Sequence, residues 1–289
     1  MGRKGYKRRP KRRPKTTLGL VLVLIITVAT TAGWIPIQHL PDALQAYLPR
    51  QEQTYKKLTV KAARHPDEQL AASVLTPAVR AQLHSQSITF NGAGAWLINH
   101  NQTDLQANVS TAPYVHLAPL DDLGRPGVAN ALLNRTSRQY RNRQETGMDR
   151  KIEPLGWHQV NLSGPYQVLY NRGHSIGYAL AGRITSFDAS EANRQNITTQ
   201  TAWANQASNG DDQNTGQNYY ETLVRRAQDQ NKLVRYRVTP VYDGSALLPA
   251  GNHLEAKSRD GSLEFNVFIP NVQPGITINY QTGQASPMK

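Results

Sequence analysis

The stretch Val168-Leu169-Tyr170-Asn171-Arg172-Gly173-His174-Ser175-Ile176-Gly177-Tyr178 decides how this chain folds around its chemistry. Its first part is apolar and β-favouring, which predicts a strand over 166–170. Gly173 permits backbone angles that other residues resist. We therefore expect the strand to run into a bend that presents the imidazole of His174 at a surface.

The segments around this stretch predict a mixed architecture. Tyr220, Leu223, Val224 and Ala227 follow the helical i, i+3, i+4, i+7 pattern, so a helix is predicted over 215–231, capped by Thr215 and ended by Asn231. Strands are predicted at 87–90, 95–99, 233–242, 253–258 and 263–269, and a further helix at 127–133. Turn signals separate the strands. Residues 86–289 therefore indicate one α+β domain with a central antiparallel sheet.

The N-terminal part has a different character. Residues 1–17 hold nine Lys or Arg and no acidic residue, and the uncharged apolar run 18–37 follows directly. Twenty helical residues reach roughly 30 Å, the thickness of the hydrocarbon layer. We expect a basic cytoplasmic tail, a single transmembrane helix at 18–37, a polar stalk at 38–85, and the domain outside the cell. A signal segment cleaved after export is the alternative reading of 18–37, and would leave a secreted protein.

Charge and cysteine content limit the function classes. The formal net charge is +13, but outside the tail there are 24 basic against 20 acidic residues, so most of the charge orients the anchor. It is therefore weak evidence for nucleic-acid binding. The chain has no cysteine. Disulfide partners, zinc–thiolate sites and a cysteine nucleophile are excluded.

The residue types near His174 suit a hydrolytic site. A histidine has an ordinary pKa of about 6.5, so near neutral pH it can accept a proton from water. Asn193, Asn196, Asn205 and Glu221 follow within 50 residues. Their oxygens suit a hard cation such as Mg²⁺, which would stabilise charge at a phosphate. A lone histidine beside a glycine is more often structural, and each asparagine alone is more often a turn or cap residue.

A series of motifs makes the reading more specific. Asn171-Arg172-Gly173-His174 resembles the Asp/Asn-Arg-Gly-His motif of the DNA/RNA non-specific endonucleases, in the ββα-metal (His-Me finger) superfamily. The similarity is greatest to DNA-uptake and secreted nucleases of Gram-positive bacteria. It extends from about 86 to 284 through ordered blocks: Arg138-Gln139-Tyr140, Gly156-Trp157-His158-Gln159-Val160, Gln200-Thr201-Ala202-Trp203-Ala204-Asn205-Gln206, Gly216-Gln217-Asn218-Tyr219-Tyr220-Glu221 and Asn271-Val272-Gln273-Pro274-Gly275.

The resemblance implies a role for each matching residue. His174 would be the general base and Asn196 the one direct protein ligand of Mg²⁺, with Mn²⁺ able to substitute. Asn205 and Glu221 would orient the water ligands. Arg143 would contact phosphate, and Arg172 would help at the phosphate or in the finger loop. Asn171, where many relatives have Asp, and Gln144, where many have a basic residue, depart from the pattern.

The expected protein is thus a ββα-metal finger nuclease: a magnesium-dependent endonuclease at the cell membrane that cuts DNA and RNA without sequence preference. The resemblance implies 5′-phosphate and 3′-hydroxyl products. Contacts to phosphates carry no sequence information, which fits non-specific cutting. The DNA-uptake machinery is a possible partner. The alternative is a catalytically weak surface component that binds DNA during uptake.

Overall fold

The computed structural model describes residues 55–60, 63–208 and 212–288. The chain divides into two compact units, Met1–Thr54 and Tyr55–Lys289, and the described residues all belong to the second. The tail at 1–17, the anchor at 18–37 and the stalk as far as residue 54 lie outside them. Within the described ranges, no helix has the length and apolar character that crossing a membrane requires.

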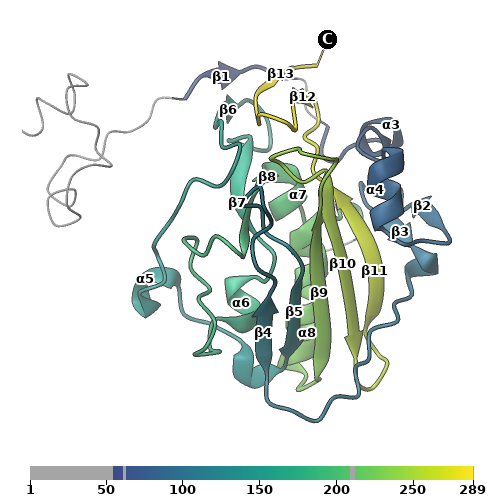
Figure 1. The fold of residues 1–289 in the computed structure, drawn as a ribbon, viewed down its shortest axis with the longest axis vertical. Helices are drawn as coiled ribbons and strands as arrows, with labels where there is room; N and C mark the ends of the chain where they lie inside the picture. The colour runs from purple at the N-terminus through teal and green to yellow at the C-terminus, as the bar shows by residue number, and fades with distance from the viewer. Residues whose placement is uncertain (1–54, 61–62, 209–211, 289) are drawn as a thin grey trace, which may run out of the picture. The chain divides into compact units, whose positions relative to one another are not determined.

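A seven-stranded antiparallel sheet forms the centre of the unit, as the sequence predicts (Figure 1). Its strand order is β2-β3-β11-β10-β9-β5-β4. In chain order these strands are β2 (Ile88–Phe90), β3 (Trp96–Ile98), β4 (Tyr114–Leu117), β5 (Ala129–Leu133), β9 (Val234–Val241), β10 (Gly251–Ser258) and β11 (Glu264–Pro270). The long strands at its middle form the rigid support for everything else.

One helix covers a face of this sheet because both surfaces are apolar. In β9 the buried residues alternate with partly exposed ones, the period of a strand with one covered face. Helix α8 (Gln217–Asp229) lies along that face and buries Tyr220, Val224 and Ala227. Asn231 has a positive φ of 61° directly after the helix, confirming it as the end. The helix begins after Gly216, without a side-chain cap from Thr215.

Two expectations about the elements are wrong. Residues 129–133 form a strand rather than a helix, because β5 pairs along β9, with Ala129 opposite Val238 and Ala131 opposite Tyr236. A short apolar run does not distinguish the two states, and the distant partner decides. The domain also begins well before residue 86. Helices α3 (Glu68–Ala72) and α4 (Pro77–Gln82) pack onto the core through Ala71 and Val79, both fully buried.

Separate two-stranded sheets complete the fold. Near the domain's N-terminal end, β1 (Lys57–Leu58) pairs in parallel with β6 (Asn161–Leu162). The C-terminal segment forms the pair β12 (Ile276–Ile278) and β13 (Ala285–Pro287). The third pair is antiparallel and joins β7 (Tyr170–His174) to β8 (Ile197–Thr201).

The pair β7–β8 and the helix after it make the expected ββα finger. Helix α7 (Ala202–Gln206) starts where β8 ends, and its Trp203 is fully buried, so truncating that side chain would cost roughly 3–5 kcal/mol. The strand predicted over 166–170 is misplaced: it occupies the Asn-Arg-Gly-His residues themselves, which pair with β8, and His174 is its last residue. A side chain at 173 would place its Cβ 1.8 Å from Gln200 Oε1. Gly173 is thus needed for packing across the pair.

Candidate active site

His174 is the last residue of β7, and the protonation of its ring nitrogens follows from a contact with Arg143. Its Nε2 lies 2.7 Å from Nη2 of Arg143. A guanidinium only donates hydrogen bonds, so Nε2 must be the acceptor and the ring proton must be on Nδ1. Burial, together with the nearby Arg143 charge, lowers the pKa of His174 to about 3. The imidazole is therefore neutral at physiological pH, the form that a general base requires.

Arg143 is held against the imidazole by three further contacts. It is the first residue of the short helix α5 (Arg143–Thr146). Its Nη1 donates to the carbonyl of Ala189 at 2.5 Å, and its guanidinium lies 4.4 Å from the centre of the Tyr178 ring. Glu191 forms a longer ion pair with it, at 3.9 Å. This cation is thus placed beside the base, as its predicted contact with phosphate requires.

Glu221 faces the same site from helix α8. Burial raises the pKa of its carboxyl group, while Arg225 and a hydrogen bond from Gln217 oppose that rise. The carboxylate lies against the backbone of Gly177, where an added Cβ would come within 2.8 Å of Oε2. Glycine at 177 therefore lets the carboxylate approach the finger closely.

Gln217 joins the two halves of the site, and the sequence reasoning missed this role. Its Nε2 donates to the His174 carbonyl at 2.6 Å and to Glu221 Oε1 at 3.0 Å. The His174 carbonyl can only accept, so the orientation of the amide is fixed. Its Oε1 accepts from Gln200 at 3.0 Å and Asn252 at 2.9 Å. One buried amide thus connects the finger, helix α8 and the central sheet.

The two candidate asparagines have different surroundings. Asn196 is fully buried, and its amide is used on the backbone of Ile176: Oδ1 accepts from the N–H at 2.9 Å, and Nδ2 donates to the carbonyl at 3.0 Å. It closes the segment after His174 and does not face the cleft, so its assignment as the metal ligand is wrong on geometric grounds. Asn205 lines the cleft beside His174. Among the described residues, the Asn205 side chain finds no hydrogen-bond partner.

Arg172 and Asn171 flank the base without touching it. The Arg172 Nε donates to the carbonyl of Ile152, and its guanidinium lies 4.6 Å from the centre of the Trp157 ring. The amide of Asn171 donates to Gln206 across to helix α7, at 3.3 Å. The amide at position 171 therefore contacts the helix of the finger and not the imidazole.

These side chains line two adjoining pockets of about 420 and 370 Å³ that share His174, Asn205 and Gln206. Lys151, Arg172 and Glu191 lie on one side, and Arg143, Tyr178 and Glu221 on the other. Arg138 does not line either pocket and is buried against Asp229 and the Ala179 carbonyl. The cleft is shallow and polar, which suits an extended polyanion.

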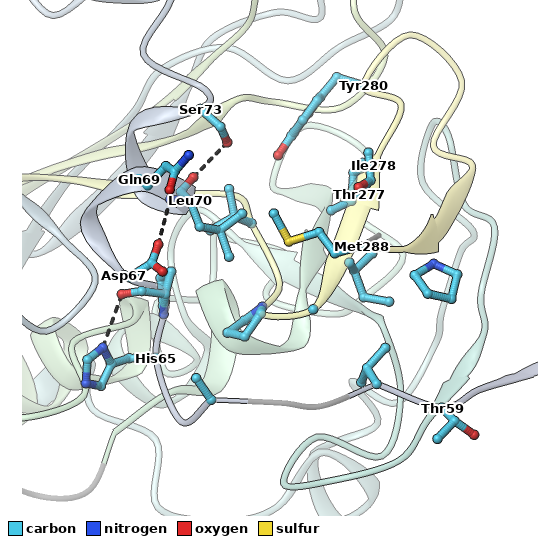
Figure 2. A pocket seen from close by; sticks show the side chains of 18 residues that line it. Thr59, His65, Asp67, Gln69, Leu70, Ser73, Thr277, Ile278, Tyr280 and Met288 are labelled. Carbon is cyan, nitrogen blue, oxygen red and sulfur yellow. Dashed lines mark hydrogen bonds between the residues drawn. The ribbon is translucent and has the colours of Figure 1, made fainter.

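A larger pocket of about 770 Å³ lies elsewhere, between the segment before α3 and the pair β12–β13 (Figure 2). Leu70, Ile278 and Met288 make its wall mainly apolar. Among the residues that the structure describes, its lining contains none of the candidate catalytic side chains. Size alone would have pointed to this pocket. The chemistry is in the smaller cleft.

A metal ion at this site would not be held by a cluster of carboxylates and histidines. In the described ranges there is no group of three or more His, Cys, Asp or Glu side chains able to hold an ion. The oxygen donors that line the cleft include the Asn205 amide and the Glu221 carboxylate beside His174, and the Glu191 carboxylate on the other side. The sequence did not predict that Glu191 and Lys151, which form an ion pair at 3.8 Å, would line the cleft. No motif connects either residue with His174.

The fold and this site define a family. The sequence model of the DNA/RNA non-specific endonucleases matches residues 106–260, more than half of the chain. The protein belongs to this family of metal-dependent endonucleases, and its substrate is nucleic acid.

Solved structures agree with the assignment. The magnesium-bound structure of NucA from Streptococcus agalactiae is 47% identical, with a TM-score of 0.66, covering 70% of this chain and 91% of that one. The metal-free structure of NucA is 44% identical, with a TM-score of 0.67, covering 75% and 100%. The zinc-bound Sda1 nuclease is 22% identical, with a TM-score of 0.54, covering 68% and 98%, and supports the fold alone.

Proposed function

We propose that this protein is a Mg²⁺-dependent endonuclease that hydrolyses DNA and RNA without sequence preference, and that Mn²⁺ can replace Mg²⁺. The carrying observation is that a neutral histidine, a free asparagine amide and a buried carboxylate meet in one cleft beside an arginine. NucA, at 47% identity, has been solved with magnesium bound. The products would carry 5′-phosphate and 3′-hydroxyl ends.

His174 would act as the general base. Its Nε2 is the ring nitrogen without a proton, and the proton of the attacking water would pass to that atom once the lone pair is free. In the free protein Arg143 covers this lone pair. A phosphate entering the cleft would attract the guanidinium to its own oxygens, since a charged phosphate is a stronger acceptor than a neutral imidazole. Substrate binding would thereby uncover the base.

Asn205 is the residue that we propose holds the metal, in place of Asn196. The fit rests on the chemistry of the donors: an amide oxygen without a protein partner, and the Glu221 carboxylate nearby, suit a hard cation that keeps several waters. When bound, Mg²⁺ would supply positive charge to stabilise the phosphate oxygens and the leaving oxygen. Glu221, held by Gln217 and Arg225, would orient water in the same cleft.

Location and biological role are proposed from the N-terminal sequence. The basic tail and the apolar run at 18–37 favour a single-pass protein with a cytoplasmic N-terminus and the nuclease domain outside the cell. A tether keeps cutting close to the membrane. It therefore favours a role in DNA uptake or local scavenging. Cleavage of the apolar segment would instead release the enzyme into the medium.

The test uses supercoiled plasmid and a structured RNA, with Mg²⁺ or with EDTA. Wild type should cut both only with Mg²⁺ or Mn²⁺. His174→Ala and Asn205→Ala should lose at least a hundredfold in rate, because each removes one element of the chemistry. Both should keep the wild-type melting temperature.

Asn196→Ala separates the two assignments. It should lower the melting temperature, because two buried backbone groups of Ile176 lose their partners, at about 1–3 kcal/mol each. Asn193→Ala is the matched control, since its amide donates to the Asp188 carbonyl outside the cleft. Full activity in His174→Ala, or metal affinity lost in Asn196→Ala but kept in Asn205→Ala, would refute the proposal. Retention of DNA without cutting by the wild type would support the DNA-binding alternative.

A further inference from the structure

Tyr140 combines high exposure with a fixed position. It is 61% exposed. Its hydroxyl donates to Asp229 Oδ1 at 2.6 Å, and the Arg138 guanidinium lies 4.7 Å from the centre of its ring. An exposed tyrosine with no function usually samples several rotamers. Here two contacts from different elements hold the ring in one place.

The support beneath the ring is itself rigid. Arg138 is only 8% exposed, donates to the Ala179 carbonyl at 2.6 Å, and pairs with Asp229 at 3.2 Å. The guanidinium occupies one face of the ring and neutralises the carboxylate that anchors the hydroxyl. The exposed fraction of the side chain leaves the opposite face open to solvent. A flat aromatic surface is thus fixed and accessible.

This surface lies next to the cleft. The backbone of residues 139–142 runs along the first turn of α6 (Tyr178–Ala181): the Gln139 N–H donates to the Ala179 carbonyl at 3.1 Å, and the Tyr178 hydroxyl donates to the Arg141 carbonyl at 3.0 Å. Tyr178 and Ala179 line the cleft. Tyr140 and Arg143 are three positions apart in the chain, a reach of at most about 10 Å.

Helix α8 gives a second estimate of the distance. Asp229, which holds the tyrosine hydroxyl, is eight residues beyond Glu221 on that helix. At 1.5 Å per residue this places the anchor about 12 Å along the helix from the carboxylate in the site. Both estimates correspond to at most three or four nucleotides, counted at the 3.4 Å rise of a duplex strand.

We infer that Tyr140 is a stacking platform for an unpaired base of the substrate, a few nucleotides from the bond that is cut. The inference rests on the proposed nuclease function. An aromatic face binds any base, because every base has a π-face, so the contact adds affinity without sequence preference. In a duplex both faces of a base are covered by its neighbours. The contribution is therefore confined to single strands, loops and frayed ends.

Cleavage of two matched substrates tests this role. Tyr140→Ala should lower kcat/KM for a single-stranded oligo(dT) about tenfold, equivalent to about 1.4 kcal/mol, and lower it less than twofold for a duplex of equal length. Tyr140→Trp should restore single-strand cutting. Met288→Ala, which removes another exposed apolar side chain at a pocket that contains no cleft residue, should change neither rate. Equal losses on both substrates, or no loss on oligo(dT), would overturn the inference.

A binding measurement separates this inference from the nuclease proposal. In EDTA, His174→Ala and the double variant His174→Ala/Tyr140→Ala are titrated with a single-stranded oligonucleotide that contains 2-aminopurine. Stacking should quench the fluorescence in the first protein, and the second should bind about tenfold more weakly without quenching. Equal affinity and quenching would refute the platform. A wild type that cuts nothing would refute only the nuclease proposal.

Discussion

Replacing Gln217 with methionine tests whether one amide holds the catalytic groups together. Methionine fills a similar volume but makes no comparable hydrogen bond. The change leaves four polar groups without their partner: the His174 carbonyl, Glu221 Oε1, Gln200 Nε2 and Asn252 Nδ2. An unsatisfied buried group costs about 1–3 kcal/mol. Glu221 keeps 13% side-chain exposure, and taking about 1 kcal/mol for each of the four groups gives a lower limit of about 4 kcal/mol in total.

That loss has two measurable effects. For a domain of this size, 1 kcal/mol shifts the melting temperature by about 2–4 °C, so Gln217→Met should melt roughly 8–16 °C lower. Well below that temperature, kcat should fall at least tenfold with little change in KM, because Gln217 orients Glu221 and the strand of His174 and touches no substrate. Calorimetry and initial rates on plasmid DNA measure both effects.

Gln228 provides a matched control on the same helix. Its buried Nε2 donates to the Asn134 and Leu180 carbonyls and to Ser137 Oγ. Gln228→Met should lose comparable stability and keep its kcat. If both variants lost kcat equally after correction for the folded fraction, Gln217 would be merely structural. A melting shift below about 4 °C for Gln217→Met would contradict the energetic reasoning.

Two other predictions concern the same cleft. Gly177→Ala should reduce kcat several-fold at nearly unchanged stability, because the new Cβ would come within 2.8 Å of Glu221 Oε2 and push the carboxylate away; wild-type rates would refute this. The ring of His174, followed by NMR, should stay neutral to below pH 4.5, because its pKa is lowered to about 3. Since the unfolded chain takes up this proton at about pH 6.5, the related stability is complete above that pH and declines as the pH falls. Arg143→Met should raise the pKa, and an unchanged or lower value would be evidence against the Arg143 contact.

The sequence predicts the long, periodic elements well. The strands of the central sheet and helix α8 carry enough alternating or helical pattern to be recognised locally. Residues 129–133 do not, because their strand state depends on pairing with β9, which is a hundred residues away. The packing of α3 and α4 was missed for a similar reason: each helix contributes few apolar side chains, and their burial depends on a distant surface.

The same distinction between local patterns and distant contacts applies to the residues of the site. His174, Arg143, Glu221 and Asn205 were named from motifs, and the structure brings them into one cleft. Asn196 was misassigned because the sequence does not distinguish an asparagine whose amide binds the backbone from one whose amide faces solvent. Only the position of Ile176 distinguishes them. Gln217 lies within one of the matching motifs. Its role could not be predicted, because its four hydrogen bonds involve three separate elements.

The finger pair β7–β8 forms a two-stranded sheet of its own among the sheets that the structure describes, and its two strands are joined by residues 175–196. That connection carries Tyr178, Ala179 and Glu191, which border the cleft, while His174 and Asn205 belong to the finger. The connection also places Tyr178 against Arg143 and Gly177 against Glu221. A change in the length or sequence of this connection would therefore move both side chains relative to His174.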